Sequence, residues 1–108
     1  LGPLNLFPVV ERVHVLEPGE ILEMKAFSMG FDPVIVKVKM GQQVVLDLTN
    51  EDITHAFDID AFDVHKTILG GKTTNIMFTP NKAGEFVFYC SIPGHTEAGM
   101  KGKFIVEE

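Results

Sequence analysis

The chain has 108 residues, 45% of them hydrophobic and 22% charged, which is the composition of one compact domain and is too short for two. Fifteen acidic residues against nine basic ones give a net charge of −6, which argues against a nucleic-acid-binding protein. Residues 4–10 are the nearest approach to a long apolar stretch, and they fall far short of the ~20 residues of a membrane span. We therefore expect one domain over residues 1–108, with residues 1–8 as an extended lead-in and with no membrane span.

Alternation of apolar and polar residues recurs along nearly the whole chain, and no long window carries an apolar stripe of helical period. This pattern predicts strands, in chain order, at residues 9–16, 21–27, 34–40, 44–49, 55–60, 73–79, 85–90 and 102–107. The segments 34–40 and 44–49 have the clearest alternation and are expected to be half-buried antiparallel strands. Short strands at near-regular spacing predict an all-β fold, a two-sheet sandwich or small barrel of about seven to eight strands.

In two of the predicted strands, chemically active side chains lie on the same face as large apolar residues. His55 lies two residues before Phe57, and Cys90 lies two residues after Phe88. Residues two apart in a strand point to the same face, so we expect His55 and Cys90 to face the core. Cys90 is the only cysteine, and no internal disulfide can form.

A loop containing Pro93 and several glycines follows Cys90 and carries His95 and Met100 at intervals of five residues. Such a loop can fold back on itself and aim its side chains at one point. With His55 it offers two imidazoles, a thiolate and a thioether, which are the donors of an electron-transfer copper site. A buried Cys or Met alone is more often core filler, but the coincidence of all four favours a metal site.

The spacing of Cys90, His95 and Met100, followed by a last strand at residues 104–106, resembles the ligand loop of the cupredoxins, the small blue copper proteins. Within that family the loop is most similar to those of rusticyanin and sulfocyanin. Residues 49–57 resemble the family's first-histidine segment, and the likeness covers residues 33–106. The resemblance implies a Greek-key β-sandwich that binds one copper ion per chain. It also implies His55 and His95 as equatorial nitrogen ligands, Cys90 as the thiolate and Met100 as the long axial ligand.

The sequence departs from the family after the first histidine, where many members carry Asn or Ser and this chain has Ala56. We expect Ala56 to leave the site less polar and to raise its reduction potential. Two further contributions to the metal site are left open, namely His65 as an auxiliary ligand and a backbone carbonyl near Gly30.

The function that the resemblance implies is that of a mononuclear type 1 copper electron-transfer protein, which cycles between Cu(II) and Cu(I). We do not expect an enzyme, because in such a site protein atoms would fill the strong coordination positions and leave none for a substrate. Two alternatives remain: a copper enzyme or sensor with an open coordination position, and a copper chaperone. A binuclear site bridged by two thiolates is disfavoured, since the chain has one cysteine.

The expected partners are redox proteins such as a cytochrome c or a terminal oxidase. We expect this chain to be a monomer and to work outside the cytoplasm. The chain begins at Leu1 rather than Met, so we expect a processed or trimmed product, in which a removed signal or membrane anchor would not be visible. A run of carboxylates without a basic residue fits either a solvated face or a patch that steers a basic partner. Its members are Asp47, Glu51, Asp52, Asp58, Asp60 and Asp63. The physiological donor and acceptor and the reduction potential are not predicted.

Overall fold

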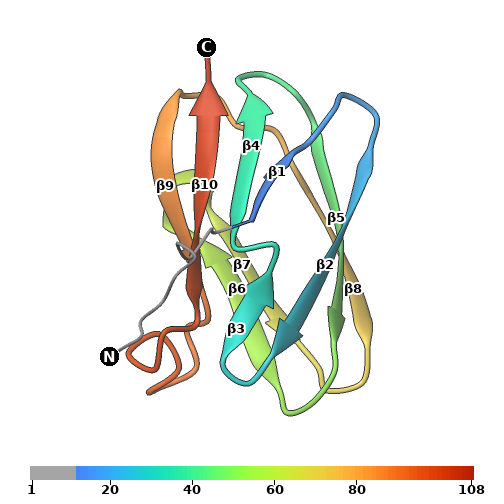
Figure 1. The fold of residues 1–108 in the computed structure, drawn as a ribbon, viewed down its shortest axis with the longest axis vertical. Coiled ribbons are helices and arrows are strands. Elements are labelled where there is room, and N and C mark those ends of the chain that lie inside the picture. The colour runs from blue at the N-terminus through green and yellow to red at the C-terminus, as the bar shows by residue number, and fades with distance from the viewer. Residues whose placement is uncertain (1–11) are drawn as a thin grey trace, which may run out of the picture.

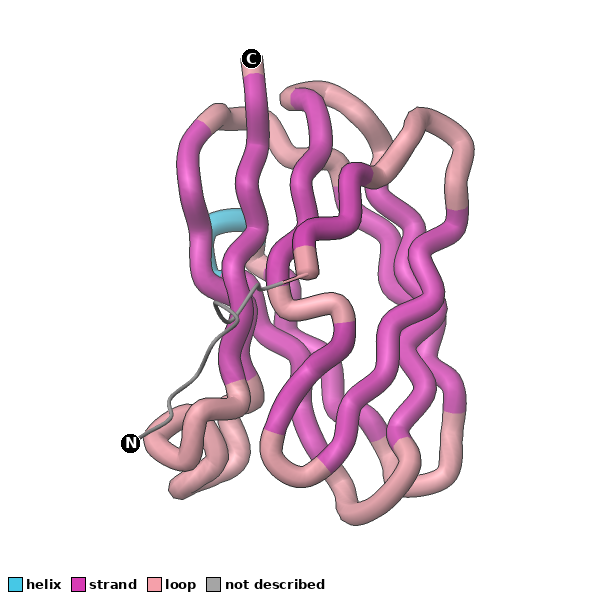
Figure 2. Tube along the Cα trace, in the orientation of Figure 1, coloured by secondary structure: helices cyan, strands magenta, loops and turns pink. Residues whose placement is uncertain are grey.

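A computed structural model describes residues 12–108, which form two packed β-sheets (Figures 1 and 2). The strands are β1 (Val13–Val15), β2 (Ile21–Phe27), β3 (Gly30–Asp32), β4 (Ile35–Lys39), β5 (Val44–Asn50), β6 (His55–Ile59), β7 (Val64–Ile68), β8 (Thr73–Phe78), β9 (Gly84–Tyr89) and β10 (Lys101–Glu107). One sheet has the order β1-β4-β10-β9-β6-β7 and the other has the order β3-β2-β5-β8. A 3-10 turn, η1 (Asp60–Phe62), links β6 to β7. The expected all-β, two-sheet fold class is confirmed.

Alternate residues of the strands build the core between the sheets. Along β5, Val44, Leu46 and Leu48 are fully buried, while the residues between them are only partly covered. The same period of two runs along β2, where every second residue is buried. Burial of one face in each sheet supplies the apolar contact that holds the two layers together.

The strand pattern differs from the sequence expectation at three places. Residues 9–11 and the expected lead-in at 1–8 lie outside the described residues, so the first expected strand is seen only as β1. The short β3 and β7 were not predicted, since β3 has three residues and β7 buries only Val64 and Ile68. The antiparallel expectation is wrong for β4, which runs parallel to both neighbours, and half wrong for β5, which is parallel to β2. Alternation reports which face is buried, and it carries no information on the direction of the neighbouring strand.

A cluster of three phenylalanine rings joins the two sheets. Phe31 of β3 packs edge-on against Phe57 of β6 and Phe88 of β9, with ring centroids 5.7 and 5.3 Å away. The rings of Phe57 and Phe88 are themselves 5.3 Å apart. Phe57 and Phe88 share strand faces with His55 and Cys90, so the ring cluster fixes the strand segments that carry these two residues.

Four connections gather at the lower end of the molecule in Figure 1: the β2–β3 turn, the β5–β6 loop, the β7–β8 turn and the long β9–β10 loop. The end of β9 and the start of β6 therefore meet beside the long loop. Within residues 12–108, no helix is long and apolar enough to cross a bilayer.

Candidate metal centre

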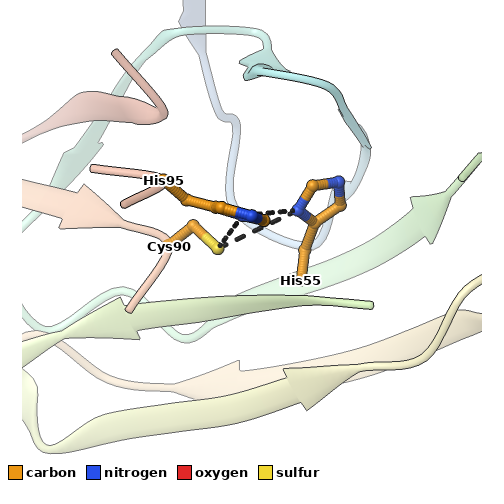
Figure 3. Close-up of side chains that lie close together, drawn as sticks. All are labelled: His55, Cys90 and His95. Carbon is orange, nitrogen blue, oxygen red and sulfur yellow. Dashed lines mark hydrogen bonds between the residues drawn. The ribbon is translucent and has the colours of Figure 1, made fainter. Parts of the chain in front are cut away.

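Three of the expected site residues bring their donor atoms together. His55 opens β6, Cys90 follows the last residue of β9, and His95 lies in the β9–β10 loop. His55 Nδ1 and His95 Nδ1 are 3.3 Å apart, and Cys90 Sγ is 3.4 Å from His95 Nδ1 and 3.9 Å from His55 Nδ1. Figure 3 shows the three side chains pointing toward one another from the two segments.

The separations of these atoms suit a single metal ion. An ion with bonds of about 2.0 Å to nitrogen and about 2.3 Å to sulfur in a trigonal plane keeps its nitrogens about 3.5 Å apart and each nitrogen about 3.7 Å from the sulfur. The three distances found here are close to these values. All three side chains are buried, which excludes water from the centre. Two imidazoles and a thiolate in this arrangement are the donors that copper takes in electron-transfer sites.

Hydrogen bonds within the β9–β10 loop hold Met100 beside the other donors. The backbone N–H of Met100 donates to the carbonyl of His95 (3.0 Å), and the N–H of Cys90 donates to the carbonyl of Met100 (3.1 Å). Thr96 closes the loop further by donating its hydroxyl to the carbonyl of Cys90 (2.6 Å). The loop turns at Gly94 and Gly99, whose φ angles of 86° and 99° lie in the region that favours glycine. Met100 is fully buried, and its ligation through the thioether stays a prediction.

The cysteine sulfur has a hydrogen-bond donor from the neighbouring strand. The backbone N–H of Ala56 lies 3.3 Å from Cys90 Sγ and donates to it. A donor of this kind stabilises negative charge on the sulfur. The methyl group of Ala56 is itself buried and brings no polar atom. Its expected effect on the reduction potential stays a prediction.

Asp52, in the β5–β6 loop, holds the outer edge of the His55 ring. Its Oδ1 lies 2.7 Å from His55 Nε2, and its Oδ2 accepts the backbone N–H of Ser28 at 2.8 Å. Burial tends to raise the pKa of Asp52, but the hydrogen bonds from His55 and Ser28 outweigh it, and the pKa is lowered. Because a carboxylate only accepts, Nε2 of His55 carries the ring proton and Nδ1 is left free to bind a metal.

His65 lies apart from the three donors. Its Nδ1 is 3.1 Å from Asp58 Oδ2 and its Nε2 is 3.4 Å from Asp63 Oδ1, so both ring nitrogens face carboxylates. The hydrogen bond to Asp58 raises the pKa of His65. Asp58 is buried and also accepts the hydroxyl of Ser91 at 3.0 Å. His65 therefore belongs to a carboxylate network on the other side of β6 from the donors.

Comparison with known proteins identifies the family. The sequence matches the cupredoxin-like domain family over residues 10–106. The chain belongs to the cupredoxin family. His55, Cys90 and His95 form a blue-copper-like site in this cupredoxin, and with the thioether of Met100 as the predicted fourth donor their chemistry fits one copper ion.

Relatives of this cupredoxin include cytochrome c oxidase subunit 2 of Thermus thermophilus, 26% identical over 77% of the chain and 62% of the relative. The copper-resistant cuproprotein CopI of Rubrivivax gelatinosus is 33% identical over 73% of the chain and 61% of the relative. The chain thus spans less than two thirds of either protein. Among solved structures, auracyanin A, a blue copper protein of Chloroflexus aurantiacus, superposes with a TM-score of 0.70 at 20% identity, covering 82% of this chain and 98% of that one.

The sequence analysis missed two contributors to the site of this cupredoxin. One is the carboxylate of Asp52, which could have been suspected from its place three residues before His55. The other is the backbone N–H of Ala56, for which no signal exists in the sequence because every residue other than proline carries such a group.

Proposed function

We propose that this cupredoxin is a mononuclear type 1 copper electron-transfer protein, cycling between Cu(II) and Cu(I) rather than acting as an enzyme. The observation that carries the proposal is the convergence of His55 Nδ1, His95 Nδ1 and Cys90 Sγ within 3.9 Å of one another in a buried place. Met100 from the same loop would supply its thioether as the fourth donor. The four donors then leave no position for a substrate or water molecule, which argues against catalysis at the metal.

The bound ion supplies the chemistry, a change of one electron between two oxidation states. The residues of the chain keep the site the same before and after that change. His55 stands on a strand fixed by the ring of Phe57, Cys90 directly follows a strand fixed by Phe88, and Asp52 holds the His55 ring from outside. Donors that do not move between oxidation states keep the reorganisation accompanying electron transfer small.

His95 is proposed as the side chain through which electrons leave and enter. It is 9% exposed, whereas His55, Cys90 and Met100 are fully buried. Its loop neighbours Pro93 and Ala98 are exposed and apolar or small, and such a surface loses its water easily. Weak redox encounters bury small interfaces, for which a patch around one imidazole edge is large enough.

The proposed partners are redox proteins such as a cytochrome c or a terminal oxidase, met by a monomer outside the cytoplasm. Two of the relatives support this class of partner by name, since both are subunit 2 of a cytochrome c oxidase from Thermus thermophilus. The chain has one cysteine, so a copper pair bridged by two thiolates is not available to it.

A copper store or chaperone is the second candidate, favoured by the similarity to the copper-resistant cuproprotein CopI. A chaperone has to release its metal readily to an acceptor and binds Cu(I) in preference to Cu(II). Four buried donors on two fixed strands and a tightly hydrogen-bonded loop favour retention of the metal instead.

The proposal is tested by adding Cu(II) to the parent chain and to Cys90→Ser and recording visible and paramagnetic-resonance spectra. We expect an intense thiolate-to-copper band that saturates at about one copper per chain in the parent and is lost in Cys90→Ser. Ser91→Ala is the matched control, because its hydroxyl faces Asp58 rather than the donors and its loss should leave the band in place.

Two outcomes would contradict the electron-transfer function. A pale solution with an ordinary tetragonal copper signal would indicate an open coordination position, as in a copper enzyme or sensor. A parent that binds only Cu(I) and passes it quickly to a chelator would indicate a store or chaperone.

A further inference from the structure

The acidic loop between β5 and β6 makes a specific contact with the proposed copper site. Asp52 is the residue of this loop that reaches a proposed ligand: its Oδ1 is 2.7 Å from His55 Nε2. Its second oxygen accepts the backbone N–H of Ser28 in the β2–β3 turn at 2.8 Å. One carboxylate thus links a proposed ligand on one sheet to a turn of the other sheet.

Both partners of Asp52 are hydrogen-bond donors. The Ser28 N–H can only donate, and His55 Nε2 must carry its proton if Nδ1 is to bind the metal. A carboxylate accepts both bonds at once. An amide at position 52 has a single acceptor oxygen and would set its NH₂ group against one of the two donors.

The loop that carries Asp52 is held in place independently of this contact. Asn50 is fully buried and donates its amide to the carbonyls of Ile53 (2.6 Å) and Ile68 (2.8 Å). Its side-chain oxygen accepts the N–H of Asp52 at 3.1 Å. Gly70 of the β7–β8 turn lies so close that a Cβ on it would collide with the carbonyl of Asp52. The carboxylate is therefore presented to His55 by a preformed loop.

We infer that Asp52 is a positioning residue of this site, whose carboxylate orients the His55 ring, strengthens its Nδ1 as a donor and lowers the reduction potential of the bound copper. The inference rests on the proposed electron-transfer function. A carboxylate on the far nitrogen of a ligating imidazole raises the basicity of the near nitrogen, and the more highly charged Cu(II) gains more from this than Cu(I) does. Removing the carboxylate should therefore favour Cu(I).

The test is voltammetry of the copper-loaded parent, Asp52→Asn, Asp52→Glu and Glu51→Gln. In Asp52→Asn we expect Cu(II) affinity to fall about tenfold relative to Cu(I), which raises the potential by about 59 mV for one electron. Asp52→Glu keeps both acceptor oxygens and should raise the potential by less. Glu51→Gln removes the neighbouring charge, which pairs with exposed Lys25 at 3.6 Å, and should change the potential least.

A second readout needs no copper, and its first measurement uses the parent chain alone. In nitrogen-resolved NMR of the copper-free parent, the ring proton of His55 is expected on Nε2 and exchanging slowly with water, because Asp52 holds it. In Asp52→Asn the same proton should exchange faster. A parent in which this proton sits on Nδ1, or exchanges as fast as that of a free imidazole, would overturn the inference.

The outcomes separate this inference from the function on which it rests. A parent without the blue band would overturn both. A blue parent with a reversible wave, in which Asp52→Asn shifts the potential no more than Glu51→Gln does, would overturn the role of Asp52 and leave the electron-transfer function standing.

Discussion

Tyr89 directly precedes Cys90 and points to the opposite side of the strand. There its hydroxyl donates to Asp60 Oδ1 at 2.7 Å. This hydrogen bond is the main reason that the pKa of Tyr89 is raised to about 12, and partial burial adds to it. Tyr89 is thus a neutral phenol at ordinary pH, and its hydrogen bond to η1 holds the last residue of β9 in place next to Cys90.

The raised pKa of Tyr89 can be measured directly, since the chain has one tyrosine and no tryptophan. We expect the tyrosinate absorbance of the parent to titrate near 12 and that of Asp60→Asn to titrate closer to the ordinary value of 10. The folded state favours the protonated phenol, so this contact adds stability below pH 10 and loses it as the pH rises toward 12. Asp63→Asn removes a nearby exposed charge that does not bond to Tyr89 and serves as the control. A parent that titrates near 10 would contradict the contact.

The residues proposed to bind the metal were all named from the sequence, whereas the groups that hold them in place were not. Cys90, His95 and Met100 are revealed by spacing, and His55 by its parity with Phe57. Asp52 lies only three residues before His55, but its bond to Ser28 in the β2–β3 turn joins segments far apart in sequence, as does the contact of the Ala56 N–H with Cys90, and no local pattern records either. Within residues 12–108, every buried side-chain nitrogen and oxygen has a hydrogen-bond partner, so such supporting contacts are general here.

At the scale of elements, alternation located the long strands well because each buries a single face. β2 is the clearest case, with bounds that coincide with those predicted, Ile21–Phe27. β7 escaped prediction because three exposed residues separate its two buried ones. The parallel pairing of β4 with β10 was missed because it brings together segments more than sixty residues apart in sequence.

The close approach of β10 to its two neighbours depends on Gly102. A Cβ at this position would collide with the Phe88 ring and with the carbonyl of Val34. We expect Gly102→Ala to lower the free energy of unfolding by about 1–3 kcal/mol, because the strands must separate or Phe88 must shift. Denaturant unfolding measures this, with Lys103→Ala as the control on the same strand, expected to change stability by less than about 0.5 kcal/mol. If the two variants are equally stable, β10 does not require a glycine at position 102.

At the scale of the molecule, the fold divides the acidic run of the sequence. Asp47 lies on β5 of the four-stranded sheet and bonds to Asn75, whereas Asp58 lies on β6 of the six-stranded sheet and is buried. The run as a whole is therefore neither one solvated face nor one steering patch. The excess of negative charge still belongs to the entire chain, whose net charge is −6, and it favours approach of basic partners.

The start of β6 and the β9–β10 loop carry the four proposed ligands, which are distributed over forty-six residues of the sequence, and both segments lie at the end of the molecule where the connections gather (Figure 1). The measurement that tests this most directly is a crystal structure of the copper-loaded chain in both oxidation states. We predict one ion bound by Nδ1 of His55, Nδ1 of His95, Sγ of Cys90 and the thioether of Met100, with the same donors after reduction. A water molecule in the thioether position, or a histidine that leaves the ion on reduction, would contradict the account.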